Sequence, residues 1–372
     1  MINAMGKRFL IACLAAAAVS VGKGGAPRDP ETEPRIFLMG VWPDRLRLFD
    51  EEAEEFIGDF RLRHGAVGAT GHTPDYRRYF FVTDRMESVE VVDVARRAVV
   101  DELKLSTEQR KVRFNGVVPD PTGRYLYLTG GTVRMEVDRF VPEEPEIIIY
   151  DLEERRIKDT FKLPEEIRHS WRVNLVVSPD GKSLFVLGQD IYELSTSTHE
   201  IVDKIVLSKP LLAGYGPFRG LGLREAESGI YYGIYRTVDP FLKKTMIGVA
   251  RLDLLGKEVE NFELGPDLKV GLFALSPDGK RGYAGLKDLI VIDMEAQRIL
   301  KRKEGFEKGR TNTSFIVSAD GKKLYISGVG DSIYVYDATT LERLKTIFAG
   351  GDFMSPATAV PRSVFQKAAV HR

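Results

Sequence analysis

Apolar positions along this chain recur as short runs, and each run ends in an acidic residue followed by a turn. The runs are rich in β-branched and aromatic residues, which favour strands. Seven copies can be aligned: Leu48-Phe49-Asp50, Val91-Val92-Asp93, Ile149-Tyr150-Asp151, Ile191-Tyr192-Glu193, Arg251-Leu252-Asp253, Val291-Ile292-Asp293 and Val335-Tyr336-Asp337. Such self-similarity predicts repeated supersecondary units, with about one copy per blade of a β-propeller.

A second motif lies before several of these copies and predicts a tight turn between two strands. Proline presets the first dihedral of the turn, aspartate bonds to the local backbone, and glycine takes the positive φ. The copies are Ser178-Pro179-Asp180-Gly181, Ser276-Pro277-Asp278-Gly279 and Ser318-Ala319-Asp320-Gly321, with a variant at Pro119-Asp120-Pro121-Thr122-Gly123.

The two motifs together predict the order of the strands, named A to D from the centre of each blade outward. The Ser-Pro-Asp-Gly turns join strand A to strand B, and the acidic turns join C to D. Both kinds of turn therefore lie on the same face of the ring, which we call the A–B face. The B–C and D–A connections then lie on the opposite face, which we call the B–C face. The predicted fold is an all-β, seven-bladed propeller of four-stranded antiparallel blades.

The two ends of the repeat region are expected to complete one blade together. The first acidic copy follows only the strand-like runs 35–41 and 45–49, and residues 357–365 form a strand-like run with no outer strands after it. Sharing one blade between the N- and C-terminal strands closes the ring and removes exposed strand edges. We therefore expect the propeller to span residues 35–365, with a C-terminal tail at 366–372.

Extra chain is concentrated on the predicted B–C face. Residues 130–145 are inserted between strands B and C of the third blade, residues 236–245 between B and C of the fifth, and residues 209–219 before the fifth blade. Long loops on a rigid scaffold are where binding usually occurs. Hairpins without a binding role are the alternative.

The N-terminus has the pattern of an export signal. Lys7 and Arg8 precede a short, alanine-rich apolar run from Phe9 to Val21. We expect a signal peptide at 1–22 and a flexible leader at 23–34, with a periplasmic or secreted product. The only cysteine, Cys13, lies inside this segment, where a lipid attachment site is the alternative. The exported chain would therefore have no disulfide, thiolate metal site or thioether-linked haem.

Charge and composition narrow the range of partners. The chain has 54 basic and 54 acidic residues and no net charge, so we expect no nucleic-acid binding. The apolar run near the N-terminus is too short to span a membrane as a helix.

Few residues suggest chemistry on this chain. The histidines have no metal-ligand spacing on one element, although His64, His72 and His169 are assigned to D–A loops. A calcium-dependent hydrolase or lactonase is one alternative, and its candidate ligands are Asp75, Asn115, Asn174 and Asn312. No catalytic residue or metal ligand is assigned. Aromatic and methionine residues near B–C-face loops instead suggest a protein interface: Trp171, Tyr215, Phe218, Phe241, Phe353 and Met354.

Two stretches resemble a known family. The insertion Val133–Pro145, leading into Ile148-Ile149-Tyr150-Asp151, is similar to the third-blade insertion of the beta subunit of quinohemoprotein amine dehydrogenase. So is the stretch from Ser314 through Tyr336-Asp337-Ala338 to Ala357. The propeller repeat itself is shared with many secreted proteins, including the methylamine dehydrogenase heavy chain.

This resemblance implies a subunit without a cofactor of its own, in a periplasmic complex that oxidises primary amines. A di-haem cytochrome c subunit and a small subunit bearing cysteine tryptophylquinone would dock on the propeller, which would support the quinone subunit and the amine pocket. The candidate contact residues, chosen from the face assignment, are His72, Asn115, Arg134, Glu136, Tyr215 and Phe353. The alternative is a free-standing secreted propeller that binds a protein or peptide through its long-loop face.

Overall fold

The computed structural model describes residues 33–163, 165–167, 174–209, 224–227, 229–306 and 312–367. The predicted signal peptide, most of the leader and the last residues of the chain lie outside these ranges, and so does Cys13. No helix in the described part of the chain is long and apolar enough to cross a membrane.

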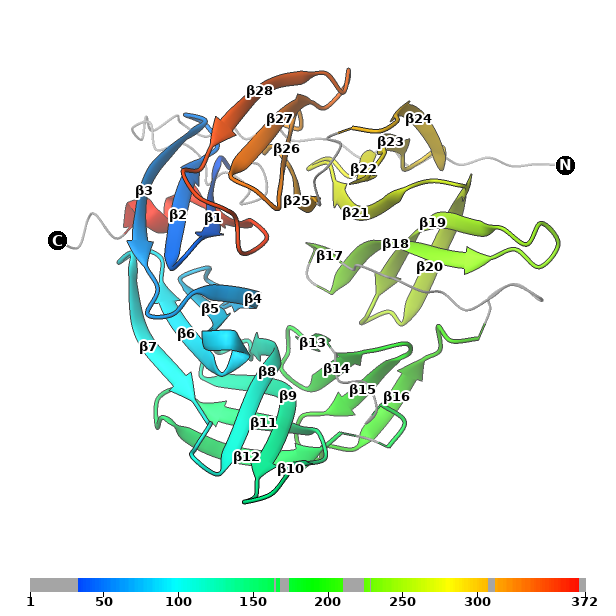
Figure 1. The fold of residues 1–372 in the computed structure, drawn as a ribbon. Coiled ribbons are helices and arrows are strands. Elements are labelled where there is room, and N and C mark those ends of the chain that lie inside the picture. Colours follow the sequence, from blue (N-terminus) through cyan, green and yellow to red (C-terminus); the bar gives the residue numbers. More distant parts are fainter. Residues whose placement is uncertain are drawn as a thin grey trace, which may run out of the picture.

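Seven antiparallel sheets form a closed ring, so the predicted seven-bladed propeller is confirmed (Figure 1). Each sheet has four strands in the order A to D, and the third blade adds a fifth strand, β10. The second blade is β4 (Ala66–His72), β5 (Arg78–Thr83), β6 (Ser88–Asp93) and β7 (Ala98–Lys104). The third is β8 (Arg110–Pro119), β9 (Tyr125–Met135), β10 (Phe140–Pro142), β11 (Glu146–Asp151) and β12 (Arg156–Lys162).

The remaining blades repeat this arrangement. The fourth is β13 (Asn174–Val177), β14 (Ser183–Leu187), β15 (Ile191–Ser195) and β16 (Ile201–Ile205). The fifth is β17 (Arg224–Glu227), β18 (Ile230–Val238), β19 (Thr245–Asp253) and β20 (Glu258–Pro266). The sixth is β21 (Val270–Leu275), β22 (Arg281–Leu286), β23 (Leu289–Asp293) and β24 (Arg298–Lys303). The seventh is β25 (Asn312–Val317), β26 (Lys323–Gly328), β27 (Ser332–Asp337) and β28 (Arg343–Phe348).

The first blade is shared between the two ends of the chain, as predicted. Its outer three strands are β1 (Arg35–Val41), β2 (Arg45–Asp50) and β3 (Glu55–Arg61), and its inner strand is β29 (Thr358–Pro361). The expected C-terminal strand at 357–365 was too long. A short helix, α1 (Arg362–Lys367), follows β29, and its Val364 and Phe365 pack against the core between the first two blades.

The A–B turns have the bonding that the Ser-Pro-Asp-Gly motif predicts. The Ser178 hydroxyl donates to Asp180 at 2.6 Å and accepts from the Ser183 amide at 2.9 Å, and Gly181 has φ +72. A further copy, Thr73-Pro74-Asp75-Tyr76, joins β4 to β5 and was not recognised in the sequence. Its Thr73 hydroxyl donates to Asp75 at 2.6 Å, and Tyr76 takes the positive φ that glycine takes elsewhere.

Most C–D turns are capped by the predicted acidic residue. Asp151, for example, accepts the amides of Glu153 and Glu154, both at 2.9 Å. The fourth blade is the exception: β15 continues to Ser195, whose hydroxyl accepts the amide of Thr198 at 3.2 Å. Glu193 is therefore not a turn residue, and it bonds Ser183 at 2.6 Å instead.

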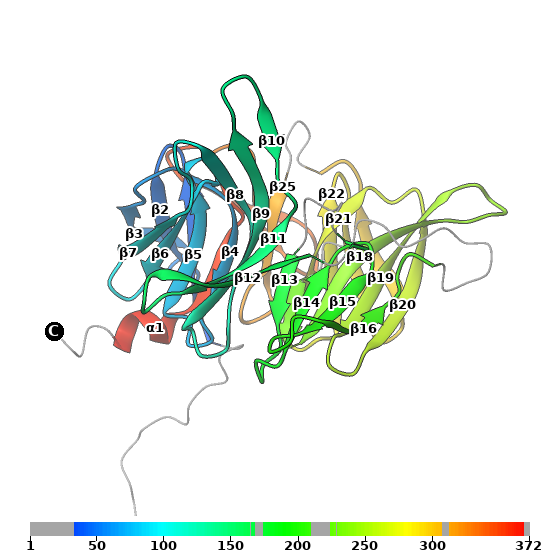
Figure 2. The same cartoon turned by 90° about the horizontal axis from the view of Figure 1, so that it is seen from below.

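The hydrophobic core lies between neighbouring blades. One cluster combines Phe80 and Val91 of the second blade with Phe114 and Leu128 of the third. Each blade therefore buries its face only against its neighbours, as expected for a propeller. Seen from the side, the A–B and C–D turns lie on one face, together with α1, and the long β9–β10 hairpin projects from the other (Figure 2).

Candidate interaction face

The B–C face carries most of the large apolar side chains that the described residues expose. Outer strands and the turn after β19 carry the rest. Those on the B–C face lie in B–C loops, in D–A loops or at the adjoining strand ends: Trp42, Val137, Phe140, Val206, Val238, Phe241, Leu242, Val329, Phe348 and Met354. Because large exposed apolar groups on one face favour binding, this face is the candidate functional site.

The insertion in the third blade forms a projecting arm. Strand β9 continues beyond its blade, pairing with β8 on one side and with β10 on the other (Figure 2). Ion pairs link Arg110 of β8 to Glu143 at 2.9 Å and Arg139 to Glu136 at 2.7 Å within the turn between β9 and β10. We call residues 130–145 the arm. The exposed tip of the arm combines the apolar Val137 and Phe140 with the charged Asp138 and Arg139.

A glycine at the base of the arm allows the two strands to approach closely. A Cβ added to Gly130 would lie 1.8 Å from the Arg113 carbonyl oxygen, whereas one added to Gly131 would meet nothing within 4 Å. Strand β8 has a bulge between Phe114 and Gly116 at this level. The absence of a side chain at Gly130 therefore permits the path of the strand into the arm.

The β18–β19 hairpin of the fifth blade presents a second apolar tip. Strands β18 and β19 pair along their whole length, from Ile230 and Asp253 to Val238 and Thr245. The Asp239 carboxylate accepts the amides of Phe241 at 2.7 Å and Leu242 at 2.8 Å. The Phe241 side chain is nevertheless 87% exposed. The turn thus holds an apolar pair in solvent in a defined conformation, which reduces the entropy cost of binding.

Buried carboxylates fix the D–A loops on this face. Glu90, which is fully buried, accepts the amides of Arg63 at 2.8 Å and His64 at 2.9 Å. Asp190 plays the same part in the fourth blade and accepts the amides of Leu207 at 2.9 Å and Ser208 at 2.7 Å. These hydrogen bonds fix the conformation of the loops, so the B–C face has a defined surface shape.

His64 has a structural role in this arrangement. Its Nε2 atom lies 3.0 Å from the Glu102 carboxylate, which also accepts hydrogen bonds from Ser88 and Arg63. Burial favours the neutral form of Glu102, but the hydrogen bonds from Ser88, Arg63 and His64 outweigh it and lower the pKa of this carboxyl. The group is therefore an ionised anchor.

The six predicted contact residues differ in where they lie and in how exposed they are. Arg134 and Glu136 lie on the arm with their charged groups 3.5 Å apart, and Asn115 lies half-buried in the inner strand β8. Tyr215 lies outside the described residues. Of the other two, His72 was assigned to the wrong face, whereas Phe353 lies in the B–C-face loop after β28 as assigned, with its side chain buried.

His72 and Phe353 differ from expectation in different ways, the first in its face and the second in its burial. His72 is the last residue of β4, next to the unrecognised Thr73-Pro74-Asp75-Tyr76 turn, so it lies toward the A–B face. Its ring stacks on Tyr76 with centroids 4.6 Å apart. Phe353 is buried in the core between the seventh and first blades, beneath its exposed neighbour Met354.

The four proposed calcium ligands do not share one end of the ring. Asp75 is in an A–B turn, where it accepts the Thr73 hydroxyl and the Arg77 amide, whereas Asn174 and Asn312 begin inner strands at the B–C end. Asn115 lies midway along its strand. Among the described residues, no group of three histidine, cysteine, aspartate or glutamate side chains is arranged to hold a metal.

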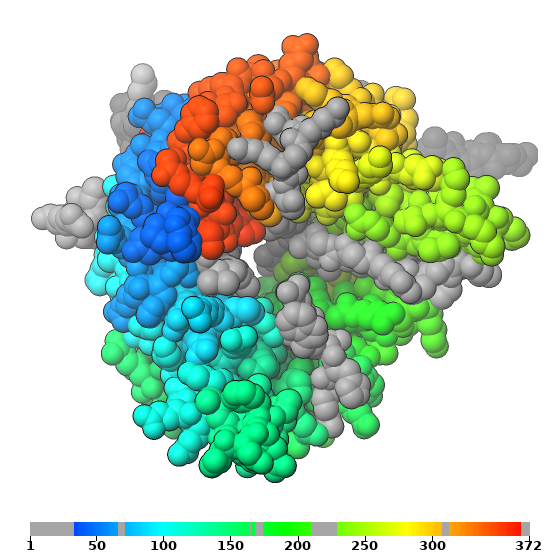
Figure 3. Space-filling model, viewed as in Figure 1, coloured from blue at the N-terminus to red at the C-terminus, as the bar shows by residue number. Residues whose placement is uncertain are grey.

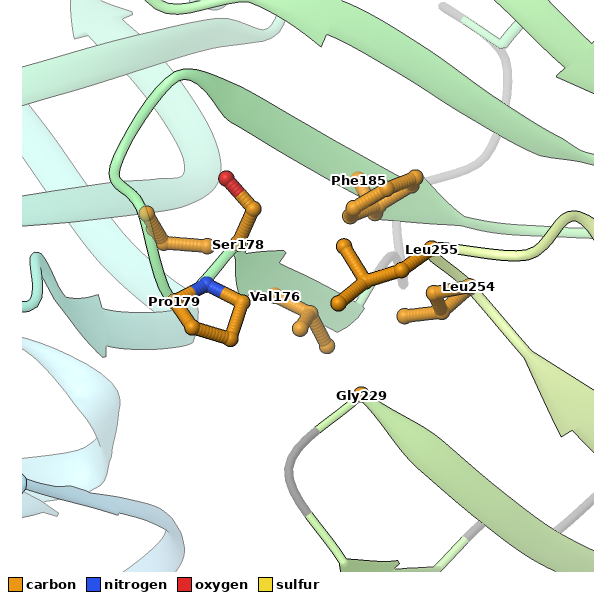
Figure 4. Close-up of a pocket in the computed structure, with 8 residues that line it drawn as sticks. Val176, Ser178, Pro179, Phe185, Gly229, Leu254 and Leu255 are labelled. Carbon is orange, nitrogen blue, oxygen red and sulfur yellow. The ribbon is translucent and has the colours of Figure 1, made fainter. Parts of the chain in front are cut away.

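A small hollow lies between the fourth and fifth blades toward the A–B face. Val176, Pro179, Phe185, Leu254 and Leu255 contribute to its lining (Figure 4). Its volume is about 20 Å³, which accommodates about one water molecule. This hollow is therefore too small for an organic substrate.

Sequence reasoning missed several of the exposed apolar residues. Trp42, Val329 and Phe348 lie in short connections or at a strand end, and Val137 and Phe140 were not singled out within the insertion. A large apolar residue beside proline or glycine in a turn, as in Trp42-Pro43 and Val329-Gly330, is the signal that could have found two of them.

Comparisons with known proteins identify the fold but no family. No family model matches the chain, and no curated protein sequence matches it. Among solved structures, dihydro-heme d1 dehydrogenase NirN in complex with DHE is 14% identical, with a TM-score of 0.56 over 93% of this chain and 78% of that one. Hydrazine synthase of Kuenenia stuttgartiensis is 14% identical, with a TM-score of 0.52 over 90% and 100%.

A functionally unknown protein from Desulfotomaculum acetoxidans is also similar. It is 11% identical, with a TM-score of 0.56 over 88% of this chain and 98% of that one. At such low identity, these likenesses support the propeller fold and carry no activity over to this chain.

Proposed function

We propose that this chain is a non-catalytic, partner-binding propeller whose B–C face docks another protein. The observation that carries the proposal is the gathering of exposed apolar side chains on that face, in loops held by hydrogen bonds. Phe241 at the tip of the β18–β19 hairpin and Phe140 on the arm are the largest side chains at the two projecting tips. Aromatic side chains presented in this way are common anchors of protein interfaces.

In its finer form, the proposal assigns the chain to an amine-oxidising complex as the propeller subunit. Support comes from the resemblance of Val133–Pro145 to the third-blade insertion of the quinohemoprotein amine dehydrogenase beta subunit, since these residues lie in the projecting arm. Two structural neighbours are named as a dihydro-heme d1 dehydrogenase and a hydrazine synthase, so the propeller fold occurs in one enzyme that acts on a haem and in one that makes a nitrogen compound.

In such a complex the partners would be a di-haem cytochrome c subunit and a small subunit bearing cysteine tryptophylquinone. The quinone would take the electrons of primary-amine oxidation and the haems would pass them on. This chain would supply the docking surface, order the quinone subunit and exclude water from the amine pocket. Arg134 and Glu136 on the arm remain contact candidates, and the exported product would act in the periplasm.

Purification of the full chain from its native host tests both forms of the proposal. The expected result is a stable complex with haem absorbance and amine dehydrogenase activity. A double variant, Val137→Asp with Phe140→Asp, should reduce recovery of the partners at least tenfold, because it replaces the two exposed apolar side chains of the arm tip with carboxylates. Leu300→Asp on the outer strand β24 is the matched control and should retain them.

The outcomes separate the alternatives. A partner protein without haem or quinone would support the free-standing binding propeller and overturn the amine dehydrogenase assignment. A chain that is purified as a stable monomer, with no protein bound to its B–C face, would overturn both forms.

A further inference from the structure

The loop between β5 and β6, on the B–C face of the second blade, contains a short turn with an unusual backbone. Asp84, Arg85 and Met86 all have positive φ, at 47°, 56° and 76°. We call Asp84–Met86 the left-handed turn; it is the only run of consecutive positive-φ residues in the described part of the chain. The turn lies against β4, β5, β6 and β8 (Figure 1), and light-blue atoms of the second blade lie at the surface in the same view (Figure 3).

This conformation is unfavourable because all three residues carry side chains. A left-handed backbone brings Cβ close to a carbonyl oxygen, which disfavours each residue other than glycine by about fivefold or more. Aspartate tolerates this region better than most residues, so the cost falls mainly on Arg85 and Met86. The preceding residue adds a second cost: Thr83 is fully buried, and its hydroxyl has no hydrogen-bond partner.

The contacts that hold the turn are few and mostly at the surface. Asp84 pairs with Lys104 of β7 at 2.7 Å, and this hydrogen bond lowers the pKa of the Asp84 carboxyl. Glu87, directly after the turn, pairs with the exposed Lys111 of β8 at 3.3 Å and donates its amide to the Asp84 carbonyl at 3.0 Å. A surface ion pair shifts a conformational equilibrium by about fivefold at most.

The side chains around the turn add little to these contacts. Met86 is half-buried and packs against the core between the second and third blades. Glu102 is already bonded to Ser88, Arg63 and His64. The exposed Arg85 forms no ion pair with any described residue. The costs and the holding contacts are therefore similar in size, so the observed turn is close in free energy to a relaxed, right-handed alternative.

We propose that the left-handed turn is a two-state element of the B–C face, left-handed in the free chain and released when a partner protein docks. The inference rests on the proposed function for the docking step. A partner shifts such an equilibrium by its difference in affinity for the two states. Release relieves the strain at Arg85 and Met86 and frees the Thr83 hydroxyl to bond, and only the surface pairs and the packing of Met86 oppose it.

Hydrogen exchange of the purified full chain, read at the Glu87 amide by NMR, tests the two states without a partner. Arg85→Gly and Arg85→Ala both remove the exposed side chain, but only glycine favours positive φ. Glu87 should therefore exchange about fivefold or more slowly in Arg85→Gly than in Arg85→Ala. Lys104→Met should speed its exchange about twofold to fivefold, whereas Lys244→Met, which removes a surface pair with Asp267 on the β18–β19 hairpin, should not.

Two results of this experiment would overturn the inference. One is a Glu87 amide that exchanges as slowly as the ladder amides of β5 and β6, because the turn would then open only with the whole blade. The other is equal exchange in the glycine and alanine variants, because the backbone at residue 85 would then carry no strain.

Binding of the two variants to the protein that co-purifies with the full chain tests the release. Arg85→Gly should bind this partner about fivefold or more weakly than Arg85→Ala, because glycine stabilises the left-handed state that docking must open. Equal or tighter binding of Arg85→Gly would show that the turn stays left-handed in the complex; it would refute the release and leave the proposed function standing. A chain that binds no protein would overturn both.

Discussion

Replacing Gly130 by alanine should destabilise the third blade, whereas the same change at Gly131 should not. A Cβ at residue 130 would lie 1.8 Å from the Arg113 carbonyl oxygen, so the strands must separate by about 1.2 Å to reach the 3.0 Å that real Cβ contacts require. Because Gly130 pairs with Phe114, this movement disturbs both the β8–β9 ladder and a core residue. The tightly packed interior resists such shifts.

The size of the effect follows from what the separation breaks. Loss of about two ladder hydrogen bonds, at about 1 kcal/mol each, together with disturbed packing around Phe114, gives a destabilisation of roughly 2 to 3 kcal/mol. For a propeller of about 330 residues, at about 2.1 cal/mol/K per residue, we expect Tm to fall by roughly 3 to 4 °C. Gly131→Ala has open space at its Cβ, so its Tm should lie within about 1 °C of the unmodified chain.

Differential scanning calorimetry of the two variants measures this difference. Hydrogen exchange adds a local readout, since the amides of residues 131–142 should exchange faster in Gly130→Ala and at the normal rate in Gly131→Ala. Equal melting temperatures for the two variants would refute the argument, because only Gly130 is in close contact with the neighbouring strand.

Three further results are expected. Removal of residues 358–372 deletes β29 and should open the ring, observed as a larger hydrodynamic radius and concentration-dependent aggregation; a compact monomer would contradict the shared blade. Burial favours the neutral form of Glu54, but hydrogen bonds from Lys323 and Lys345 outweigh it and lower the pKa of this carboxyl. These ion pairs therefore contribute to folding stability above about pH 4.3, the pKa of a glutamate in the unfolded chain, and the contribution is lost as pH falls through the lowered pKa. Lys323→Met should therefore cost about 1 kcal/mol at pH 7 and less at pH 3 in denaturant titrations, whereas the exposed Lys322→Met should cost little; equal losses at both pH values would exclude this linkage. Addition of calcium followed by chelation should leave Tm unchanged, and a reversible rise with calcium would revive the hydrolase alternative.

Much of the fold could be predicted because its signals are local. A turn such as Ser178-Pro179-Asp180-Gly181 contains its own donors, acceptors and dihedral preferences, so nearby residues suffice to identify it. The same logic failed at Thr73-Pro74-Asp75-Tyr76, where tyrosine takes the place of glycine, and this placed His72 on the wrong face. It also failed at Glu193, where an apolar-acidic run looked like a turn but lay within a strand.

The B–C face was predictable as the face that carries the long loops, but the exposure of its individual residues was not. Loop lengths located the arm, including Arg134 and Glu136, because an insertion in a repeat is visible in the spacing alone. Phe353 and Met354 are adjacent, yet one is buried and the other exposed. That difference depends on the loops packed around them, which no local pattern encodes.

The sequence by itself determined the number of blades, the order of strands and the identity of the two faces. These features follow from turn chemistry and strand alternation within a few residues, repeated along the chain. Only the tertiary structure decided that Trp42, Val329 and Phe348 stay exposed near the junction of the seventh and first blades. They come from opposite ends of the chain and lie together because β29 closes the ring against β1, a long-range pairing whose packing decides which side chains stay in solvent.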